Sequence, residues 1–166
     1  GGNASMSPYA TGGGLYVEAS RLTVAQCTFE GNQAANNGGG VYVWDSQVTF
    51  TACLFSGNKS FGFGTALAIY PDVGQTRTAT AIITDCSFKE NLLTYAVTAN
   101  KTNLNLVRTF FLDNAGGALA ATDRVTLTAE NCVFTRNGGS EGACYIGTRS
   151  QANINYCTLA NDYANE

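Results

Sequence analysis

The stretch that decides the fold is Cys27-Thr-Phe-Glu-Gly-Asn-Gln-Ala-Ala-Asn-Asn-Gly-Gly-Gly-Val-Tyr-Val43. It joins two motifs, an F-x-x-N element at Phe29 to Asn32 and a glycine-rich element at Gly38 to Tyr42. Both motifs recur along the 166 residues of the chain. Self-similarity with a period of about 20–50 residues is the signature of stacked structural repeats, so we expect a repeat architecture.

The F-x-x-N motif occurs in five intact copies, followed by a degraded copy at Leu159 to Asp162. The position two residues before the aromatic residue holds Cys in every copy but one, which has Thr109. From Cys27 to Cys157 these positions are separated by 26, 33, 23, 23 and 25 residues. The longest step contains an insertion near residues 71–78, which we expect to project as a loop. The repeated residues are Phe29, Phe55, Phe88, Phe111 and Phe134, with Asn32, Asn58, Asn91, Asn114 and Asn137.

Each repeat contains short runs in which apolar and polar residues alternate. One run precedes the cysteine, as in Leu22-Thr-Val24, another follows the glycines, as in Val41-Tyr-Val43, and the Cys-x-Phe pair gives a third. Alternation with period two indicates half-buried strands. A leucine-rich repeat has a similar period, but its leucine pattern is absent. The sequence therefore predicts an all-β fold, a right-handed parallel β-helix of about six coils with 23–33 residues per coil.

Stacking coils about 4.8 Å apart places equivalent residues of successive repeats above one another. The phenylalanines would then form an internal aromatic stack. The asparagines would form a ladder of amide hydrogen bonds at a turn. The glycines would permit sharp corners with positive φ.

The alternation of F-x-x-N with two glycines, a small residue and an aliphatic residue resembles the repeats of chlamydial polymorphic outer membrane proteins. More broadly, it is similar to the pectin-lyase-like β-helix superfamily. The resemblance extends from Gly12 to about Asp162. It implies the fold and leaves the function open, because one fold hosts many functions.

We expect residues 1–166 to form a single β-helix segment. The chain begins with Gly1 and ends in a partial repeat, and neither end resembles the cap that a solenoid requires. The sequence is therefore interpreted as a slice of a longer repeat protein.

Composition narrows the class of protein. A net charge of −3 with 13% charged residues argues against nucleic acid as a partner, and no apolar run reaches the roughly 18 residues of a membrane span. Low charge together with many Thr, Ser and Asn residues suits an extracellular surface. The six cysteines indicate an oxidising compartment, so we expect an extracellular or cell-surface location. Because the chain has no His and no C-x-x-C motif, we expect neither a metal nor a cofactor.

Five cysteines share one register and are candidates for disulfides between neighbouring coils. The pairs Cys27–Cys53, Cys53–Cys86 and Cys132–Cys157 are all within reach, whereas Cys86 and Cys132 are separated by the coil of Thr109. The alternative is a column of small buried thiols. The remaining cysteine, Cys144, is expected to be buried.

Three sequons make Asn3, Asn58 and Asn100 candidate glycosylation sites. Asn100 lies in a polar loop and is the best acceptor of the three. Asn58 belongs to the predicted ladder and should be hidden.

The residues that alternate with the inward-facing aliphatics after each glycine corner should point outward. Stacked coils would gather them into a partial aromatic stripe, interrupted by Ala68, Thr98 and Ala120. Exposed aromatic rings on a flat sheet suit sugar rings or a partner protein, although β-propensity alone also favours aromatics in strands. The candidate binding residues are Tyr16, Tyr42, Trp44, Tyr70 and Tyr145.

An enzyme of this fold that hydrolyses glycans would need two carboxylates facing one cleft, but the 12 acidic residues are scattered. A lyase would need a Lys or Arg base near an acidic cluster, which is also absent. We therefore predict no catalytic residues and a non-enzymatic, extracellular structural or adhesive module of a larger cell-surface or filament-forming protein. Its partners would be other copies or segments of a larger surface assembly, and glycans. The alternatives are a carbohydrate-binding module that uses the aromatic stripe, and a remote relative of polysaccharide lyases or hydrolases.

Overall fold

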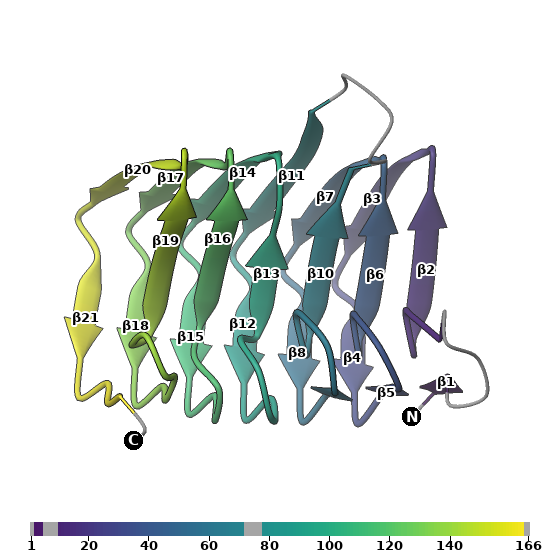
Figure 1. Cartoon of the computed structure of the whole chain (residues 1–166), viewed down its shortest axis with the longest axis horizontal. Coiled ribbons are helices and arrows are strands. Elements are labelled where there is room, and N and C mark those ends of the chain that lie inside the picture. Colours follow the sequence, from purple (N-terminus) through teal and green to yellow (C-terminus); the bar gives the residue numbers. More distant parts are fainter. Residues whose placement is uncertain (1, 5–9, 72–77, 165–166) are drawn as a thin grey trace.

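The chain folds into a parallel β-helix in which every coil adds one strand to each of three sheets (Figure 1). The computed structural model describes residues 2–4, 10–71 and 78–164. Within these residues the secondary structure consists of strands and turns without a helix. The fold class expected from the repeats, an all-β parallel β-helix of about six coils, is confirmed.

Each of the three sheets has six strands, one from each coil. The first sheet contains β2 (Leu15–Glu18), β6 (Val41–Trp44), β10 (Leu67–Tyr70), β13 (Val97–Ala99), β16 (Leu119–Asp123) and β19 (Cys144–Thr148). The second contains β3 (Arg21–Ala25), β7 (Gln47–Thr51), β11 (Ala79–Thr84), β14 (Thr102–Val107), β17 (Thr126–Glu130) and β20 (Gln151–Asn155). The third contains β4 (Thr28–Glu30), β8 (Leu54–Ser56), β12 (Ser87–Lys89), β15 (Phe110–Leu112), β18 (Val133–Thr135) and β21 (Thr158–Ala160). A small additional sheet joins β1 (Asn3–Ala4), β5 (Gln33–Ala34) and β9 (Lys59–Ser60).

The register of the strands follows the sequence repeat. Val43 pairs with Ile69 in the first sheet, and Phe55 pairs with Phe88 in the third. Because side chains alternate between the faces of a strand, each residue type that recurs with the repeat is placed on the same face in every coil. The sheets thereby enclose one continuous apolar core.

The five phenylalanines of the F-x-x-N motif stack along the axis of this core. Successive ring centroids lie 4.5 to 5.0 Å apart, with interplanar angles of 13° or less. The four rings after the first coil are fully buried, and Phe29 in the first coil is half-buried. Phe50 from the second sheet meets the edge of Phe55 at a centroid distance of 5.4 Å. Offset stacking and edge contacts of this kind are the arrangements that aromatic rings prefer.

The five asparagines form a buried ladder at the turn that follows the third sheet. In each step an amide Nδ2 donates to the Oδ1 of the asparagine in the next coil, for example Asn91 to Asn114 at 2.9 Å. The same Oδ1 accepts the backbone N–H of the preceding asparagine, and Nδ2 also donates to the carbonyl of a phenylalanine in the coil before. The ladder thus fastens three coils at once, and Asp162 occupies its last step through Oδ1.

The glycine corners serve two purposes. Gly38 and Gly64 take φ values of +64° and +63°, which an L-residue adopts only with strain. Gly39 instead lies where a Cβ atom would come 2.4 Å from the carbonyl oxygens of Lys59 and Thr65, so glycine is required there for close approach of the next coil. The expectation that the glycines supply the positive φ of the corners holds only in part. At the corner between the second and third sheets, exposed non-glycine residues such as Ala52 take positive φ.

Phe88→Ala should lower the free energy of unfolding by about 3–5 kcal/mol, because it removes a fully buried ring between two others. Denaturant unfolding measures the loss. Phe29→Ala is the matched control at the half-buried end of the stack and should cost less. A cost well under 1 kcal/mol for Phe88→Ala would contradict the stacked core.

Asp162→Asn should stabilise the last coil by about 1 kcal/mol. Oδ2 of Asp162 is buried and has no hydrogen-bond partner among the described residues, at the place where the other ladder residues present a donating amide. Hydrogen exchange of the β21 amides and the thermal midpoint measure the gain. Asn114→Asp is the reverse control and should destabilise, because it removes donation to Phe88 O and Asn137 Oδ1. Equal stability of all three proteins would exclude this role of the amide.

Candidate functional site

The outer face of the first sheet carries aromatic side chains over its first three coils. In β2, β6 and β10 the inward positions hold aliphatic residues such as Val17, Val43 and Ile69, which are buried. The alternate positions point away from the core, as the sequence predicts. They bring together four of the five candidate binding residues, namely Tyr16, Tyr42, Trp44 and Tyr70.

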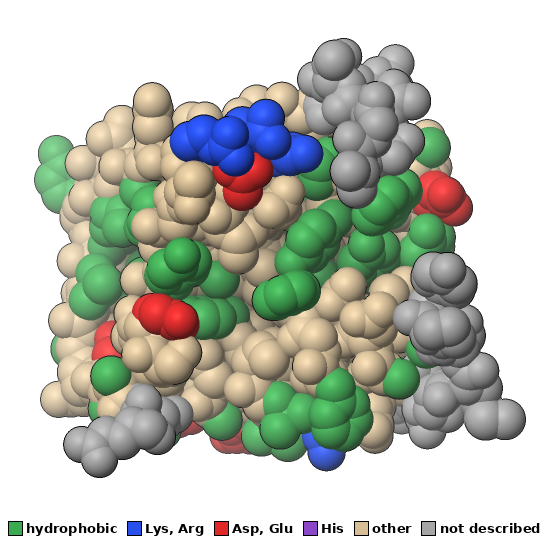
Figure 2. All heavy atoms as spheres, viewed as in Figure 1, with side chains coloured by type: hydrophobic (Ala, Val, Ile, Leu, Met, Phe, Trp, Pro, Cys, Tyr) green, Lys and Arg blue, Asp and Glu red, His purple; other side chains and the backbone are tan. Residues whose placement is uncertain are grey.

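The four rings lie nearly parallel around Tyr42. Its centroid is 5.6 Å from that of Tyr16 and 6.2 Å from those of Trp44 and Tyr70, with interplanar angles of 18° to 22°. Phe63 extends the group, with its centroid 6.3 Å from that of Tyr70. We call these five residues the aromatic patch, and Figure 2 shows hydrophobic side chains gathered on this face.

Tyr42 is less exposed than the alternation suggests. It is only 6% exposed, whereas Tyr16 is 46% exposed, because the neighbouring rings surround it. Tyr42 therefore supports the patch, and the rings around it provide most of the accessible surface.

The sequence pattern missed Phe63. It is 56% exposed and lies in the loop before β10, outside the alternation of the strands. The signal that could have found it is the Phe61-Gly-Phe-Gly64 run, in which aromatics stand directly before a glycine corner. Phe61 in turn packs under Lys59, whose Nζ lies 5.1 Å from the ring centroid.

Tyr145 shares a register column with Tyr42 but does not join the patch. Ala68, Thr98 and Ala120 separate the two along the column. These small residues are buried. Because none of them is aromatic, they interrupt the aromatic stripe, as the sequence predicts. The patch is confined to the first three coils.

A shallow groove of about 530 Å³ opens beside the patch. Aromatic side chains form one part of its wall, and polar side chains that can donate and accept hydrogen bonds form the other. It is lined by Thr11, Tyr16, Glu18, Asn36, Asn37, Tyr42 and Trp44.

The tyrosine hydroxyls of the patch remain protonated at physiological pH. Burial raises the pKa of Tyr42 to about 12, with a smaller contribution from Tyr16. Burial also raises the pKa of Tyr70, and burial together with Glu18 raises that of Tyr16. The patch therefore presents neutral rings with hydroxyl groups.

A group of cations lies along the edge where the first sheet ends and the second sheet begins, in the last three coils. Asp123 Oδ2 is 3.2 Å from Nε of Arg124, and Asp123 Oδ1 is 3.0 Å from a terminal nitrogen of Arg149. The backbone N–H of Lys101 donates to the carbonyl of Asp123, which places Lys101 in the adjoining coil. We call Lys101, Arg124 and Arg149 the cationic corner, and Figure 2 shows the Lys and Arg side chains together at this edge.

Comparison with models of protein families gives a match that covers most of the chain. Residues 6–159 match the family model described as the right-handed β-helix region. The chain belongs to the right-handed β-helix family. Neither the curated proteins nor the solved structures contain a significant match to it.

Three aspartates of this right-handed β-helix, Asp85, Asp113 and Asp123, form ion pairs with arginines at its corners. Asp85 binds Arg108 through two hydrogen bonds of 2.6 and 2.8 Å, and Asp113 binds Arg136 in the same way. The hydrogen bond from Arg108 holds the pKa of Asp85 below its usual value, and Arg136 does the same for Asp113. Among the residues that the structure describes, no three His, Cys, Asp or Glu side chains lie close enough to hold a metal ion. In the described ranges, no helix has the length and hydrophobicity needed to cross a membrane.

The disulfides considered in the sequence analysis are not formed, and all six cysteines are free thiols. The five candidates, Cys27, Cys53, Cys86, Cys132 and Cys157, are used as local hydrogen-bonding groups instead. Each Sγ lies 3.2 to 3.4 Å from the carbonyl oxygen two residues earlier.

Thr109 makes the same contact through its hydroxyl, which explains why it can replace a cysteine in this column. Cys86 and Cys157 also accept a backbone N–H from the preceding coil. Cys144, expected to be buried, is half-buried, because it lies in the last coil.

The three sequons differ in accessibility. Asn3 lies in β1, and its sequon continues into residues outside the described part of the chain. Asn58 is fully buried in the ladder, as the sequence predicts, so it is not accessible for glycosylation in the folded protein. Asn100 is half-buried, and its amide donates to the Thr122 hydroxyl at 3.0 Å. The insertion at residues 71–78 lies mostly outside the described residues.

The thiols should differ in reactivity in the native protein. Cys27 is exposed and should react first with iodoacetamide, whereas Cys86 and Cys132 are buried. Burial raises the pKa of both buried thiols to about 11. Because the thiolate is the reactive form, their labelling should accelerate only as the pH approaches that value.

Mass spectrometry of labelled peptides as a function of pH measures this order, and Cys27→Ser should remove the fast phase. Rapid labelling of Cys86 near neutral pH would contradict the burial, and an unreactive Cys27 linked to Cys53 would contradict the free thiols.

Proposed function

We propose that this β-helix is a non-catalytic, extracellular structural or adhesive module of a larger cell-surface or filament-forming protein. The observation that carries the proposal is the aromatic patch, in which four rings on the outer face of the first sheet and Phe63 in the adjoining loop gather from three coils. Contiguous apolar groups on an exposed face are typical of contact surfaces. The patch is the surface through which the module makes its contact.

The rest of the molecule suits a scaffold. Its interior is a continuous column of stacked phenylalanines and hydrogen-bonded amides, which joins each coil to the next. Asp85 and Asp113 are bound to arginines rather than facing each other across a cleft. The resemblance of the repeats to those of chlamydial polymorphic outer membrane proteins favours the cell surface as the location.

Carbohydrate is the second candidate for what the module contacts. The groove beside the patch joins aromatic rings to amide, hydroxyl and carboxylate groups. Sugar rings have an apolar face and a polar rim, so they match a site of this composition. This observation favours a glycan over a flat apolar protein surface.

The double variant Tyr16→Ala/Trp44→Ala should abolish adhesion of the chain without unfolding it, because both rings are at least partly exposed. Binding to a glycan array and to immobilised copies of the chain measures the contact, and the thermal midpoint reports folding. Phe110→Ala is the matched control, since Phe110 is 44% exposed on β15 in the third sheet.

Loss of binding in the double variant alone would support the patch as the contact surface. Unchanged binding, or equal loss in Phe110→Ala, would refute it.

A further inference from the structure

We propose that a second copy of this chain docks on the corner between the third and first sheets, through a two-fold contact of the exposed residues Phe61, Leu92 and Leu93. We call these three residues the apolar ridge. The inference rests on the structural form of the proposed function, and it adds the partner and a second surface at which that partner binds.

The ridge is formed by two neighbouring coils. Phe61 follows β9 and is 63% exposed, while Leu92 and Leu93 follow β12 and are 43% and 48% exposed. Lys59 forms a parallel bridge with Leu92, so the segments that carry Phe61 and the leucines lie side by side. Figure 2 shows hydrophobic side chains gathered at the lower edge of the view. Contiguous apolar side chains on an exposed surface are typical of contact sites.

The ridge stands between coils that have small residues at the same positions. In the coil after it, Ala115 takes the place of Leu92, since the N–H of each donates to the carbonyl of the ladder asparagine in the coil before. Gly116 accordingly takes the place of Leu93. In the coil before it, Ala35 takes the place of Phe61. The ridge therefore projects from the corner with lower surfaces on both sides, beside which a second ridge can pack.

The backbone around Phe61 is fixed by hydrogen bonds to the coil before. The N–H of Gly62 donates to the carbonyl of Asn36 at 2.8 Å, and the N–H of Phe63 donates to Oδ1 of Asn37 at 2.7 Å. A side chain whose backbone is already ordered loses less conformational entropy when a partner binds. Phe61 is thus arranged for contact before the partner arrives.

Leu93 faces solvent with a strained backbone. Its φ is +88°, a value that glycine accepts and that a residue with a Cβ adopts only with strain. An exposed leucine adds nothing to the core, so its burial does not offset this strain. Backbone strain of this kind is found at functional positions, and contact with a partner gives the side chain a role.

Charge favours a second copy as the partner. Glu90 comes directly after β12, on the third-sheet side of the ridge, whereas Nζ of Lys59 lies over Phe61, 5.1 Å from the ring centroid and toward the first sheet. None of the ion pairs among the described residues includes Lys59 or Glu90. A two-fold axis that crosses the ridge between the two charges places Lys59 of each copy against Glu90 of the other. One surface then serves both copies, as in closed dimers generally.

The size of the ridge indicates a weak dimer. Three large side chains that are about half exposed can bury roughly 300 Å² in each copy. A standard interface buries about 800 Å² in each partner. We therefore expect a reversible dimer that forms at high local concentration.

Charge reversal tests the two-fold contact. Sedimentation velocity of the chain, from about 1 μM to about 1 mM, measures the dimer. Lys59→Glu and Glu90→Lys should each weaken dimerisation by about tenfold, because two attractive pairs become two repulsive ones. An equimolar mixture of these two variants should dimerise as the wild type does, since each copy then meets the opposite charge at both positions.

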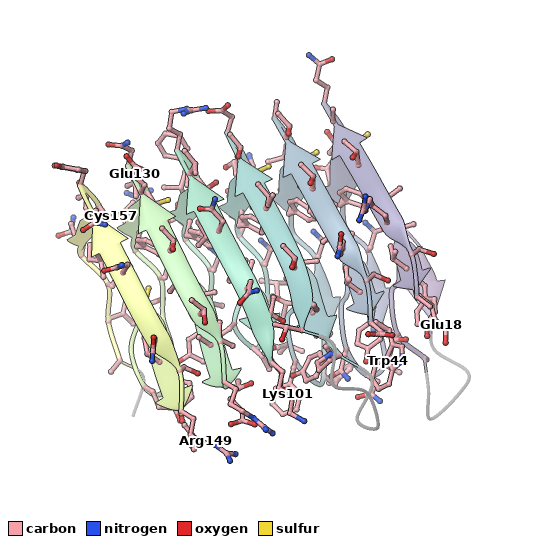
Figure 3. All side chains as sticks on the ribbon, turned by 90° about the horizontal axis from the view of Figure 1, so that it is seen from above. Glu18, Trp44, Lys101, Glu130, Arg149 and Cys157 are labelled. Atoms are coloured by element: carbon pink, nitrogen blue, oxygen red, sulfur yellow. The ribbon has the colours of Figure 1, made fainter. Side chains whose placement is uncertain are left out.

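The matched charge controls lie away from the ridge. Figure 3 shows Lys101 and Glu130 at opposite edges of the second sheet. Lys101→Glu and Glu130→Lys change the net charge of the chain by the same amounts as the two ridge variants. They should leave dimerisation unchanged, both alone and when mixed.

Removal of apolar side chains is the second test. Phe61→Ser and Leu93→Gly should each weaken the dimer by about tenfold or more. Leu93→Gly should leave the thermal midpoint of the monomer unchanged or raise it, because glycine accepts the positive φ. Phe110→Ser is the matched control, since Phe110 is 44% exposed on β15 in the third sheet, and it should not affect the dimer.

Several results would overturn the inference. A wild-type chain that stays monomeric over the whole concentration range refutes it. A dimer that is unaffected by Phe61→Ser and Leu93→Gly refutes it as well. So does a mixture of Lys59→Glu and Glu90→Lys that remains monomeric, or an equal effect of Lys101→Glu and Lys59→Glu.

The proposed function is tested separately, because Tyr16→Ala/Trp44→Ala leaves the ridge intact. If the chain is monomeric but this double variant loses adhesion, the aromatic patch remains the contact surface and only the two-fold dimer is overturned. If the ridge variants abolish a dimer while the double variant still adheres, the ridge is the contact and the patch is refuted. A monomeric chain whose adhesion does not depend on Tyr16 and Trp44 would overturn both.

Discussion

The structure depends on the exact vertical register of its coils, and the buried asparagine ladder is the interaction that enforces it. Each Oδ1 accepts two hydrogen bonds from the coil before, and each Nδ2 reaches both neighbouring coils. A buried amide left without these partners would carry a large desolvation penalty. A slip by one residue would break every rung and turn the stacked phenylalanines out of the core. Backbone pairing supplies most of the hydrogen bonds, and the ladder selects one pairing among the alternatives.

The candidate site is a by-product of the same register. Since residues in equivalent positions lie above one another, a short run of aromatic residues at outward positions becomes a continuous surface without any dedicated loop. Tyr16 and Tyr42 pair directly across neighbouring strands, and so do Trp44 and Tyr70. Charges follow the same rule, because Arg124 and Arg149 are one coil apart at one corner and share the carboxylate of Asp123. Surface chemistry on this β-helix therefore changes along its axis, coil by coil.

The repeat alone was sufficient to predict the strands, the stack and the ladder, because a feature that recurs with the period must be in contact with itself. It could not predict features that depend on departures from the period. Phe63 lies in a loop, so the alternation of residues in the strands does not reveal it. The burial of Tyr42 results from the rings around it. The cysteine column was compatible with disulfides and with local hydrogen bonds, and only the contacts of each Sγ distinguish the two. Some corner residues with positive φ, such as Ala52, are not glycines, so the sequence gives no sign of their unusual backbone conformation.

Because successive coils make near-identical contacts, the length of the β-helix is proportional to its number of coils. Adding or removing one repeat would move everything beyond it by a single coil spacing of about 4.8 Å, while the neighbouring coils would meet the same kind of surface as before. The distance between the rings of the first three coils and the arginines of the last two is therefore adjustable only in whole steps. The separation of two surface features is therefore set by the number of repeats between them, and gain or loss of repeats changes that separation without redesigning the core.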